Sequence, residues 1–217
     1  MELLKKIGII PVNKDVLYSL FNDLKQPKDK ITDLERKGLI IRIKRDLYVV
    51  SKKVHNQEIS SELVANHLYG PSYISFETAL AFYGLIPEKV YTMRSATFKQ
   101  AKRFENAVGN FEYIVVPQNY YSIGISQQII NNEYTYMIAT PEKALCDTIL
   151  ATPNLRLQSV KAMQIYLEED LRVDFSGIQN INTEIIKQCL EIGKKKMELK
   201  MLNEFFRKYH FRHNKPI

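Results

Sequence analysis

Several features are scarce in this 217-residue chain, and each shortage excludes a class of protein. No stretch approaches the roughly 18 to 20 uninterrupted apolar residues that a membrane-spanning helix needs. The first ten residues, MELLKKIGII, lack the apolar core and small residues of a signal peptide. The only cysteines, Cys146 and Cys189, provide neither a disulfide framework nor a CxxC pair. We therefore expect a cytoplasmic protein that does not contact a membrane.

The usual signatures of enzymes and cofactor sites are also missing. The sequence has no glycine-rich phosphate loop and no HExxH motif, and Ser75 is not surrounded by a GxSxG motif. The four histidines, His55, His67, His210 and His213, have no nearby paired acids or cysteines. The last two could share one helical face, but histidines near a basic terminus are usually solvated. We predict no catalytic residue, no metal site and no cofactor.

The charge of the chain is distributed unevenly. Hydrophobic residues make up 45% and charged residues 25%, which is typical of a folded globular protein, and the net charge is +7. Residues 1–56 carry 13 basic and 7 acidic side chains, residues 57–190 carry 10 and 14, and residues 191–217 carry 8 and 3. A basic head and a basic tail around a slightly acidic middle place any nucleic-acid contact at the ends of the chain.

The first 56 residues have the pattern of a small DNA-binding domain. After a short helical segment at 2–7, apolar residues spaced by three and four predict a helix that follows Asn13. Pro27 begins a third helix, which Gly38 ends. Two β-rich runs, 39–43 and 47–50, flank a tight turn and predict a hairpin. Three short helices followed by a basic hairpin are the plan of a winged helix-turn-helix domain.

The charges of this domain fit contact with double-stranded DNA. The candidate contact residues are Lys28, Lys30, Thr32, Arg36, Lys37, Arg42, Lys44 and Arg45. Thr32 and Arg36 project from the third helix toward bases, the lysines flank them near phosphates, and the hairpin residues reach a neighbouring backbone or minor groove. Asp29 and Asp33 lie on or near the same outer face. They either accept hydrogen bonds from cytosine amino groups or show that this helix faces water.

Residues 57–217 predict a larger α+β domain. A polar linker at 51–57 precedes helices at 58–68 and 75–84. Extended segments then predict a small antiparallel sheet, including a hairpin around Asn131-Asn132, with Lys99, Lys102 and Arg103 in a loop. A helix begins at Thr140-Pro141, and two more helices cover roughly 155–170 and 183–210. The predicted fold class is α+β, with an N-terminal winged helix followed by this larger domain.

Three segments resemble the AbiEi family, the antitoxins of AbiE-type (type IV) abortive-infection systems that act in phage defence. They are residues 68–88 (LYGPSYISFETALAFYGLIPE), 138–147 (IATPEKALCD) and 34–50 (LERKGLIIRIKRDLYVV). The resemblance implies a DNA-binding head that represses its own operon through inverted repeats. It also implies a larger domain that counters a nucleotidyltransferase-like toxin without a stable complex having to form. Such wings usually carry glycine where this chain has Asp46, which predicts a wider turn.

The sequence therefore predicts a non-catalytic transcriptional autorepressor and antitoxin, with two copies binding a repeated operator and a possible cooperative self-association on DNA. Three alternatives remain open. The first is a free-standing winged-helix regulator without a toxin, and the second is a protein-interaction module. The third is a nuclease that uses Glu142, Lys143 and Asp147, although the two acids lie about 140° apart around one helix.

A possible base-stacking surface comes from four tyrosines, Tyr120, Tyr121, Tyr134 and Tyr136. Tyrosines that alternate along a strand more often pack within the sheet than stack on bases.

Overall fold

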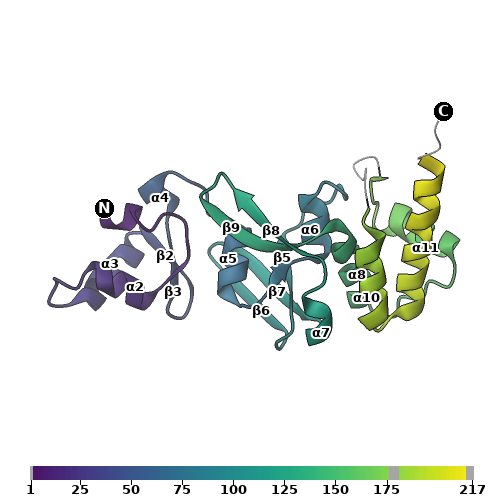
Figure 1. Ribbon diagram of the computed structural model, residues 1–217. Helices are drawn as coiled ribbons and strands as arrows, with labels where there is room; N and C mark the ends of the chain where they lie inside the picture. The colour runs from purple at the N-terminus through teal and green to yellow at the C-terminus, as the bar shows by residue number, and fades with distance from the viewer. Residues whose placement is uncertain (1, 176–180, 214–217) are drawn as a thin grey trace.

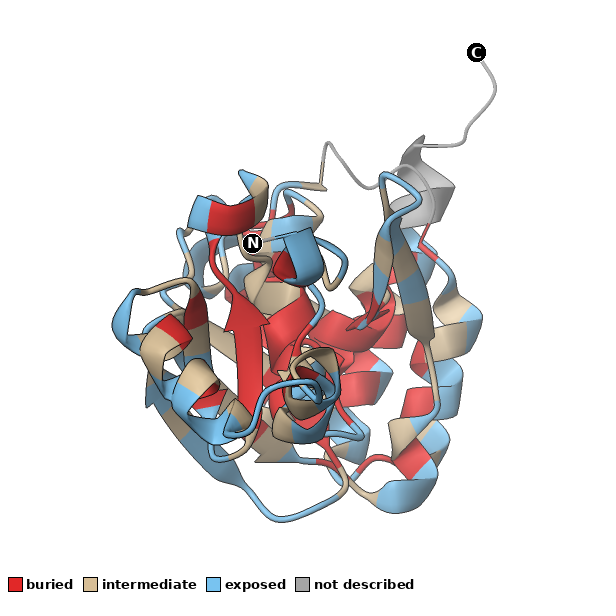
Figure 2. Cartoon of the chain, turned by 90° about the vertical axis from the view of Figure 1, so that its left-hand side faces the viewer, coloured by how far each residue is buried: buried red, intermediate tan, exposed pale blue. Residues whose placement is uncertain are grey.

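The computed structural model describes residues 2–175 and 181–213, with side chains described as far as residue 208. The chain runs from an N-terminal head, through a central sheet, to a group of C-terminal helices (Figure 1). In a view from the head end, buried residues gather in the central strands and helices while exposed residues occupy loops and outer helix faces (Figure 2). The coarse α+β class is confirmed. No helix among the described residues is long and apolar enough to cross a membrane.

The head contains four helices and a three-stranded sheet. In chain order its elements are α1 (Glu2–Lys5), β1 (Val12–Asn13), α2 (Lys14–Leu20), α3 (Pro27–Arg36), β2 (Ile40–Lys44), β3 (Leu47–Val50) and α4 (Lys52–His55). The strands lie in the order β1-β3-β2, and both pairings are antiparallel. The side chains that form the head's own core are Leu4, Leu17, Ile31, Leu34, Ile40, Tyr48, Val50 and Val54.

The turn of the β2–β3 hairpin is tight, as the two flanking β-rich runs predicted, and not widened by Asp46. Lys44 pairs with Leu47, so only Arg45 and Asp46 form the turn. Asp46 adopts the left-handed conformation, with φ of 61°, that a glycine would otherwise supply. Its carbonyl oxygen accepts a hydrogen bond from the Lys14 N–H at 3.0 Å, which fixes the turn against α2. The expected wider turn is therefore wrong.

The expected linker at 51–57 is also partly wrong. Residues Lys52–His55 form the short helix α4, because the Ser51 side chain accepts from the Lys53 N–H and caps the first turn. Val54 packs into the core of the head. Asn56 ends the helix with a left-handed backbone, and the chain then leaves the head.

The rest of the chain surrounds a six-stranded sheet. Its first half contains α5 (Ser61–Leu68), β4 (Tyr73–Ile74), α6 (Phe76–Phe82), β5 (Thr92–Thr97), β6 (Lys102–Asn106), β7 (Gly109–Val115) and α7 (Gln118–Tyr121). Its second half contains β8 (Ile125–Ile130), β9 (Tyr134–Ala139), α8 (Pro141–Ala151), α9 (Val160–Ile165), the π-helical turn η1 (Tyr166–Asp170), α10 (Thr183–Ile192) and α11 (Lys196–His213). The strand order is β6-β7-β5-β4-β9-β8.

This sheet is mixed rather than wholly antiparallel. The pair β8/β9 is antiparallel, as the hairpin around Asn131-Asn132 predicted. The pairs β4/β5 and β6/β7 are also antiparallel, whereas β5/β7 and β4/β9 are parallel. The chain reverses direction after β5 and again after β6, so β7 runs in the same direction as β5 and pairs with it. The segment around Lys102 and Arg103, which was expected to be a loop, is the edge strand β6.

Helix α8 lies at the centre of the C-terminal part. Pro141 occupies its first turn, and the Thr140 hydroxyl oxygen accepts from the Lys143 N–H, as the sequence predicted. Eight consecutive residues, Glu142 to Ile149, are buried, so neighbours cover this helix on all sides. The helix expected at 183–210 is instead two helices, because Gly193 has an extended backbone (ψ 152°) that breaks the helical path.

The hairpin of the head packs against the central sheet. Ile43, Leu47 and Val49 belong to the larger hydrophobic cluster rather than to the head's own core. Asn106 of β6 donates a side-chain hydrogen bond to the Ile43 carbonyl at 3.0 Å. Helix α3 lies on the opposite side of the head, away from the sheet (Figure 1). One face of the hairpin is therefore occupied by the protein itself, whereas α3 is not covered by it.

Candidate nucleic-acid interface

Helix α3 presents one buried edge and one exposed face. Ile31 and Leu34 are buried in the head, with exposed fractions of 6% and 5%. Because a helix turns about 100° per residue, Lys28, Thr32 and Arg36 follow one another along a different face, and all three are exposed. The Thr32 hydroxyl donates to the Lys28 carbonyl at 3.1 Å, so its oxygen keeps free acceptor capacity. The exposed face is thus polar and basic.

Asp33 lies at the side of this face and binds two of the predicted contact residues. Its carboxylate oxygens lie 2.7 Å from Arg36 Nη2 and 2.6 Å from Lys37 Nζ. Hydrogen bonds from Lys37 and Arg36 hold the pKa of Asp33 below its ordinary value. Asp33 is therefore a paired carboxylate rather than a free negative charge. Lys30 is half-buried and Asp29 is exposed.

The guanidinium of Arg42 links the hairpin to the end of α3. It lies 5.6 Å from the centre of the Tyr48 ring, and its Nε donates to the Tyr48 hydroxyl at 3.3 Å. Glu35 of α3 lies 4.0 Å away. The hydrogen bond to Tyr48 raises the pKa of Arg42 above its ordinary value. About half of its side chain (52%) remains exposed beside α3.

The other two hairpin cations point in different directions. Arg45 stands at the tip with 93% of its side chain exposed and has Asp46 within 3.6 Å. The Lys44 ammonium instead donates to the Leu68 carbonyl of α5 at 2.8 Å, across the boundary between head and sheet. Of the eight predicted residues, six lie on α3 or beside it, and Arg45 lies at the hairpin tip. The six are Lys28, Lys30, Thr32, Arg36, Lys37 and Arg42. Lys44 does not join them.

A second basic group, which the sequence reasoning did not connect with the head, lies at the end of α5. Lys99 donates to the Gly70 carbonyl at 2.7 Å, and the ammonium groups of Lys99 and Lys102 lie 5.8 and 5.0 Å from the Tyr69 ring centre. With Lys44, these lysines surround the carboxyl-terminal end of α5, where the helix dipole favours positive charge. The basic cluster was visible in the sequence, but its neighbours were not.

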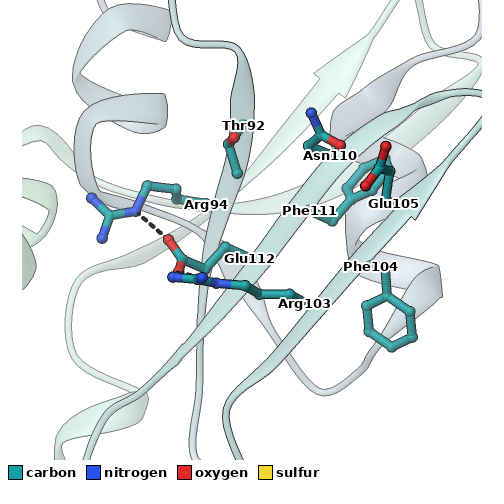
Figure 3. Close-up of a pocket in the computed structure, with 8 residues that line it drawn as sticks. All are labelled: Thr92, Arg94, Arg103, Phe104, Glu105, Asn110, Phe111 and Glu112. Atoms are coloured by element: carbon teal, nitrogen blue, oxygen red, sulfur yellow. Dashed lines mark hydrogen bonds and ion pairs between the residues drawn. The ribbon is translucent and has the colours of Figure 1, made fainter.

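An open cleft of about 800 Å³ lies over β5, β6 and β7. The side chains of Arg94 and Arg103 stand on either side of the Glu112 carboxylate (Figure 3). Arg94 Nε lies 3.0 Å from Glu112 Oε2, and Arg94 also pairs with Glu77. Burial alone would raise the pKa of Glu112, but the hydrogen bond from Arg103 and the charge of Arg94 lower it. The two arginines are thus matched by two acids, which indicates a structural network.

The group considered as a possible nuclease site is buried inside the protein. The side chains of Lys143 and Asp147 are both 0% exposed and lie 3.4 Å apart. Asp147 Oδ2 accepts from the Tyr73 hydroxyl at 3.0 Å and from the Ser75 hydroxyl at 2.6 Å. The Glu142 carboxylate accepts the Asn182 N–H at 2.7 Å. These contacts leave the three residues committed to neighbouring elements rather than convergent on a substrate.

The remaining candidates also have structural partners. Tyr120 and Tyr136 are buried, and the Tyr121 ring lies 5.0 Å from the ring of Tyr73, so these tyrosines pack in the interior. His55 and His67 interact with backbone carbonyls, and the side chains of His210 and His213 lie outside the described residues. Within the described ranges, no group of three or more His, Cys, Asp or Glu side chains is placed to hold a metal ion.

Comparison with known proteins supports the fold alone. No protein-family model matches the chain, and no curated protein matches it. Among solved structures, the RV2827C protein from Mycobacterium tuberculosis superposes with a TM-score of 0.52 at 10% sequence identity. The match covers 94% of this chain and 78% of that one. The two proteins therefore share an arrangement of elements along most of this chain. The resemblance to the AbiEi family remains a prediction.

Proposed function

We propose that the head is a winged helix-turn-helix domain that binds double-stranded operator DNA, with α3 as the helix that enters the major groove. The observation that carries this proposal is the exposed face of α3. Its polar row of Lys28, Thr32 and Arg36 is exposed, while Ile31 and Leu34 anchor the buried edge. A recognition helix needs this division, because one edge must be held by its own domain while the other meets bases and phosphates.

In this proposal the β2–β3 hairpin is a wing that contacts DNA through its tip and one edge. Arg45 is free to reach a phosphate or the minor groove, and Arg42 lies beside the end of α3. Lys44 is removed from the DNA-contacting set, because its ammonium is directed to the Leu68 carbonyl. The contact surface is consequently centred on α3, with the hairpin tip as its margin.

The proposal extends to the biological role that the sequence resemblance implies. We propose that the protein represses its own operon and acts as the antitoxin to a nucleotidyltransferase-like toxin. The segments at 68–88 and 138–147 support this role. A regulator without a toxin partner would share the same head, so the test of the second role must be separate from the test of DNA binding.

Fluorescence anisotropy tests the DNA-binding proposal. A labelled duplex from the region upstream of the gene is compared with a scrambled duplex across a range of salt concentrations. Arg36→Ala should reduce the preference for the upstream duplex by about 10-fold, as expected for loss of one good base contact. Arg45→Gln should weaken binding to both duplexes. The slope of the logarithm of the binding constant against the logarithm of the salt concentration should become shallower by the amount expected for about one lost phosphate contact. Lys161→Gln, which removes an exposed charge from α9, is the matched control.

The result that would overturn the proposal is equal binding by wild-type protein and the Arg36→Ala, Arg45→Gln double variant at every salt concentration. Absence of any binding at physiological salt would favour the protein-interaction module instead.

Co-expression tests the antitoxin role. A nucleotidyltransferase-like gene adjacent to this one is expressed with the full-length wild-type chain or with Arg36→Ala. We expect both chains to restore growth, because the substitution affects DNA binding and not the larger domain. Loss of growth in both cases, or absence of such a neighbouring gene, would leave a free-standing regulator as the better reading.

A further inference from the structure

The two edges of the six-stranded sheet differ in how they are protected. At one edge, β6 carries Lys102, Arg103 and Glu105, and its last residue, Asn106, bonds to β2 of the head. At the other edge, β8 has the sequence ISQQII, without a charged residue or a proline. Natural proteins usually protect an edge strand with charges, proline, a bulge or a covering element, because its unpaired backbone groups attract another strand. The β8 edge has neither charged residues nor a proline to protect it.

The structure determines which backbone groups of β8 point outward. In the next strand, the Met137 N–H and carbonyl both bond to the Asn66 side chain, on the side of β9 that faces away from β8. Gln127 is the partner of Met137 across the β8–β9 ladder. In an antiparallel pair such a position is not hydrogen-bonded, so the N–H and carbonyl of Gln127 also point away from β9.

A second contact supports this assignment. The Thr140 N–H donates to the Gly124 carbonyl at 2.8 Å, which shows that the even-numbered positions of this ladder face inward. Because the direction alternates along a strand, Ile125 and Ile129 direct their backbone groups outward with Gln127. Among the described residues, none hydrogen-bonds to these six groups. They form a row of three donors and three acceptors at the free edge.

The side chains along this edge match a second copy of the same strand. A twofold axis at Gln127 places Gln127 opposite Gln127 of the other copy, and Ile125 opposite Ile129. Ile129 is 58% exposed and gains an apolar neighbour in this register. The Gln127 amide nitrogen already donates to Thr135 at 3.0 Å, which leaves its carbonyl oxygen to accept across the axis. Since β8 carries no charge, self-pairing brings no like charges together.

We propose that β8 is a self-association surface, on which two copies of this chain pair their β8 strands antiparallel around Gln127 and form one continuous twelve-stranded sheet. Pairing a strand with its own twofold copy is an isologous contact, so it closes at two subunits. The inference goes beyond DNA binding and does not depend on it, because the association is expected in free solution.

Light scattering during size-exclusion chromatography of the full-length protein, without DNA, tests this proposal. We expect a mass about twice 25.3 kDa for the wild type and for Gln127→Ala, which keeps the backbone N–H. Gln127→Pro removes the N–H at the axis and, like Gln127→Ala, the side-chain bond to Thr135, but no backbone bond to β9. It should therefore give the monomer mass with an unchanged circular dichroism spectrum. Ile129→Lys, which alters only an exposed side chain, should also give the monomer and serves if the proline variant unfolds.

Oxidative cross-linking tests the register. Both native cysteines are buried, so a new surface cysteine is the one that reacts. Gln127→Cys should form a covalent dimer, whereas Ser126→Cys should not, because residue 126 faces residue 128 of the other copy. The proposal would be overturned if the wild-type protein stayed monomeric even at concentrations about 100 times those used in the DNA-binding assay. It would also be overturned if the Gln127→Pro variant and the Ile129→Lys variant each remained dimeric.

Discussion

Asp33 and Arg36 form an ion pair on the last turns of α3, with 2.7 Å between Oδ1 and Nη2, and Lys37 closes on the other carboxylate oxygen. The arginine proposed to read a base is therefore bound to an acid of its own helix before DNA arrives. Binding must exchange this intramolecular contact for a contact with a base or phosphate. The same acid helps to orient the guanidinium, so its net effect on DNA affinity is measurable by removing its charge.

We predict that Asp33→Asn strengthens DNA binding. The substitution releases Arg36 and Lys37 and removes a negative charge that would face phosphates, so affinity for DNA should rise roughly 5-fold. The slope of the logarithm of the binding constant against the logarithm of the salt concentration should become steeper, by the amount expected for about one additional phosphate contact. Anisotropy titrations at several salt concentrations measure both quantities.

The matched control is Glu184→Gln, which removes one exposed carboxylate of α10 that pairs only with Lys187 among the described residues. It should leave affinity nearly unchanged. Weaker binding by Asp33→Asn would show that the ion pair positions Arg36 more than it competes with DNA.

A second prediction concerns the buried pair Lys143–Asp147. Lys143→Met leaves a carboxylate inside the protein without its cation and should lower the free energy of unfolding by about 3–5 kcal/mol. Combining it with Asp147→Asn should cost less than the sum of the two single changes, because the double variant contains neither charge. Urea unfolding followed by circular dichroism gives the three values. Lys161→Met on the surface of α9 should change stability by less than about 0.5 kcal/mol.

The same group shows what the sequence could and could not predict. Residues close in sequence set the cap of α8 and the turn signals, so Thr140, Pro141 and the hairpin around Asn131-Asn132 were placed correctly. Ser75 begins the helix predicted at 75–84 and occupies the N-cap position of α6. Its hydroxyl, however, bonds to Asp147, which is 72 residues away. Local rules identified the position but not its long-range partner.

The candidate interface divides in the same way. The three-residue spacing of Ile31 and Leu34 puts both on one edge of α3, which is buried in the structure, and the exposed face follows from that edge. Charge alone could not distinguish Arg45, which is exposed beside Asp46 at the hairpin tip, from Lys44, whose ammonium lies against the Leu68 carbonyl. That difference depends on how the hairpin packs against α5, which belongs to a distant part of the sequence.

Glu112 gives a pH prediction. Its pKa in the folded protein lies below the ordinary value of 4.5, despite burial, because of Arg103 and Arg94. A carboxyl with a lowered pKa stabilises the fold above its unfolded pKa, and this contribution is lost as the pH falls through the folded pKa. The stability difference between wild type and Glu112→Gln should therefore shrink as the pH falls from about 6 to about 3. Glu105→Gln is the control, because it removes the carboxylate of an exposed residue on the neighbouring strand β6.

The last prediction concerns Gly124, which enters β8 with φ of +58°. A Cβ at this position would lie 2.8 Å from Ile185 Cγ2 and 2.9 Å from Lys143 Cβ, both too close for an unshifted side chain. Gly124→Ala therefore combines an unfavourable backbone conformation with overpacking between β8, α8 and α10. It should lower the free energy of unfolding by about 2–4 kcal/mol.

Gly8→Ala separates these two causes. Gly8 has a similar φ of +65°, but nothing lies within 4 Å of its added Cβ. Gly8→Ala should therefore lower the free energy of unfolding only through the unfavourable backbone conformation, by about 1 kcal/mol. Urea unfolding of the two variants measures the difference, which represents the packing around Gly124. Equal losses would mean that Ile185 and Lys143 move aside without cost, and the close contact of β8 with α10 would then contribute little to stability.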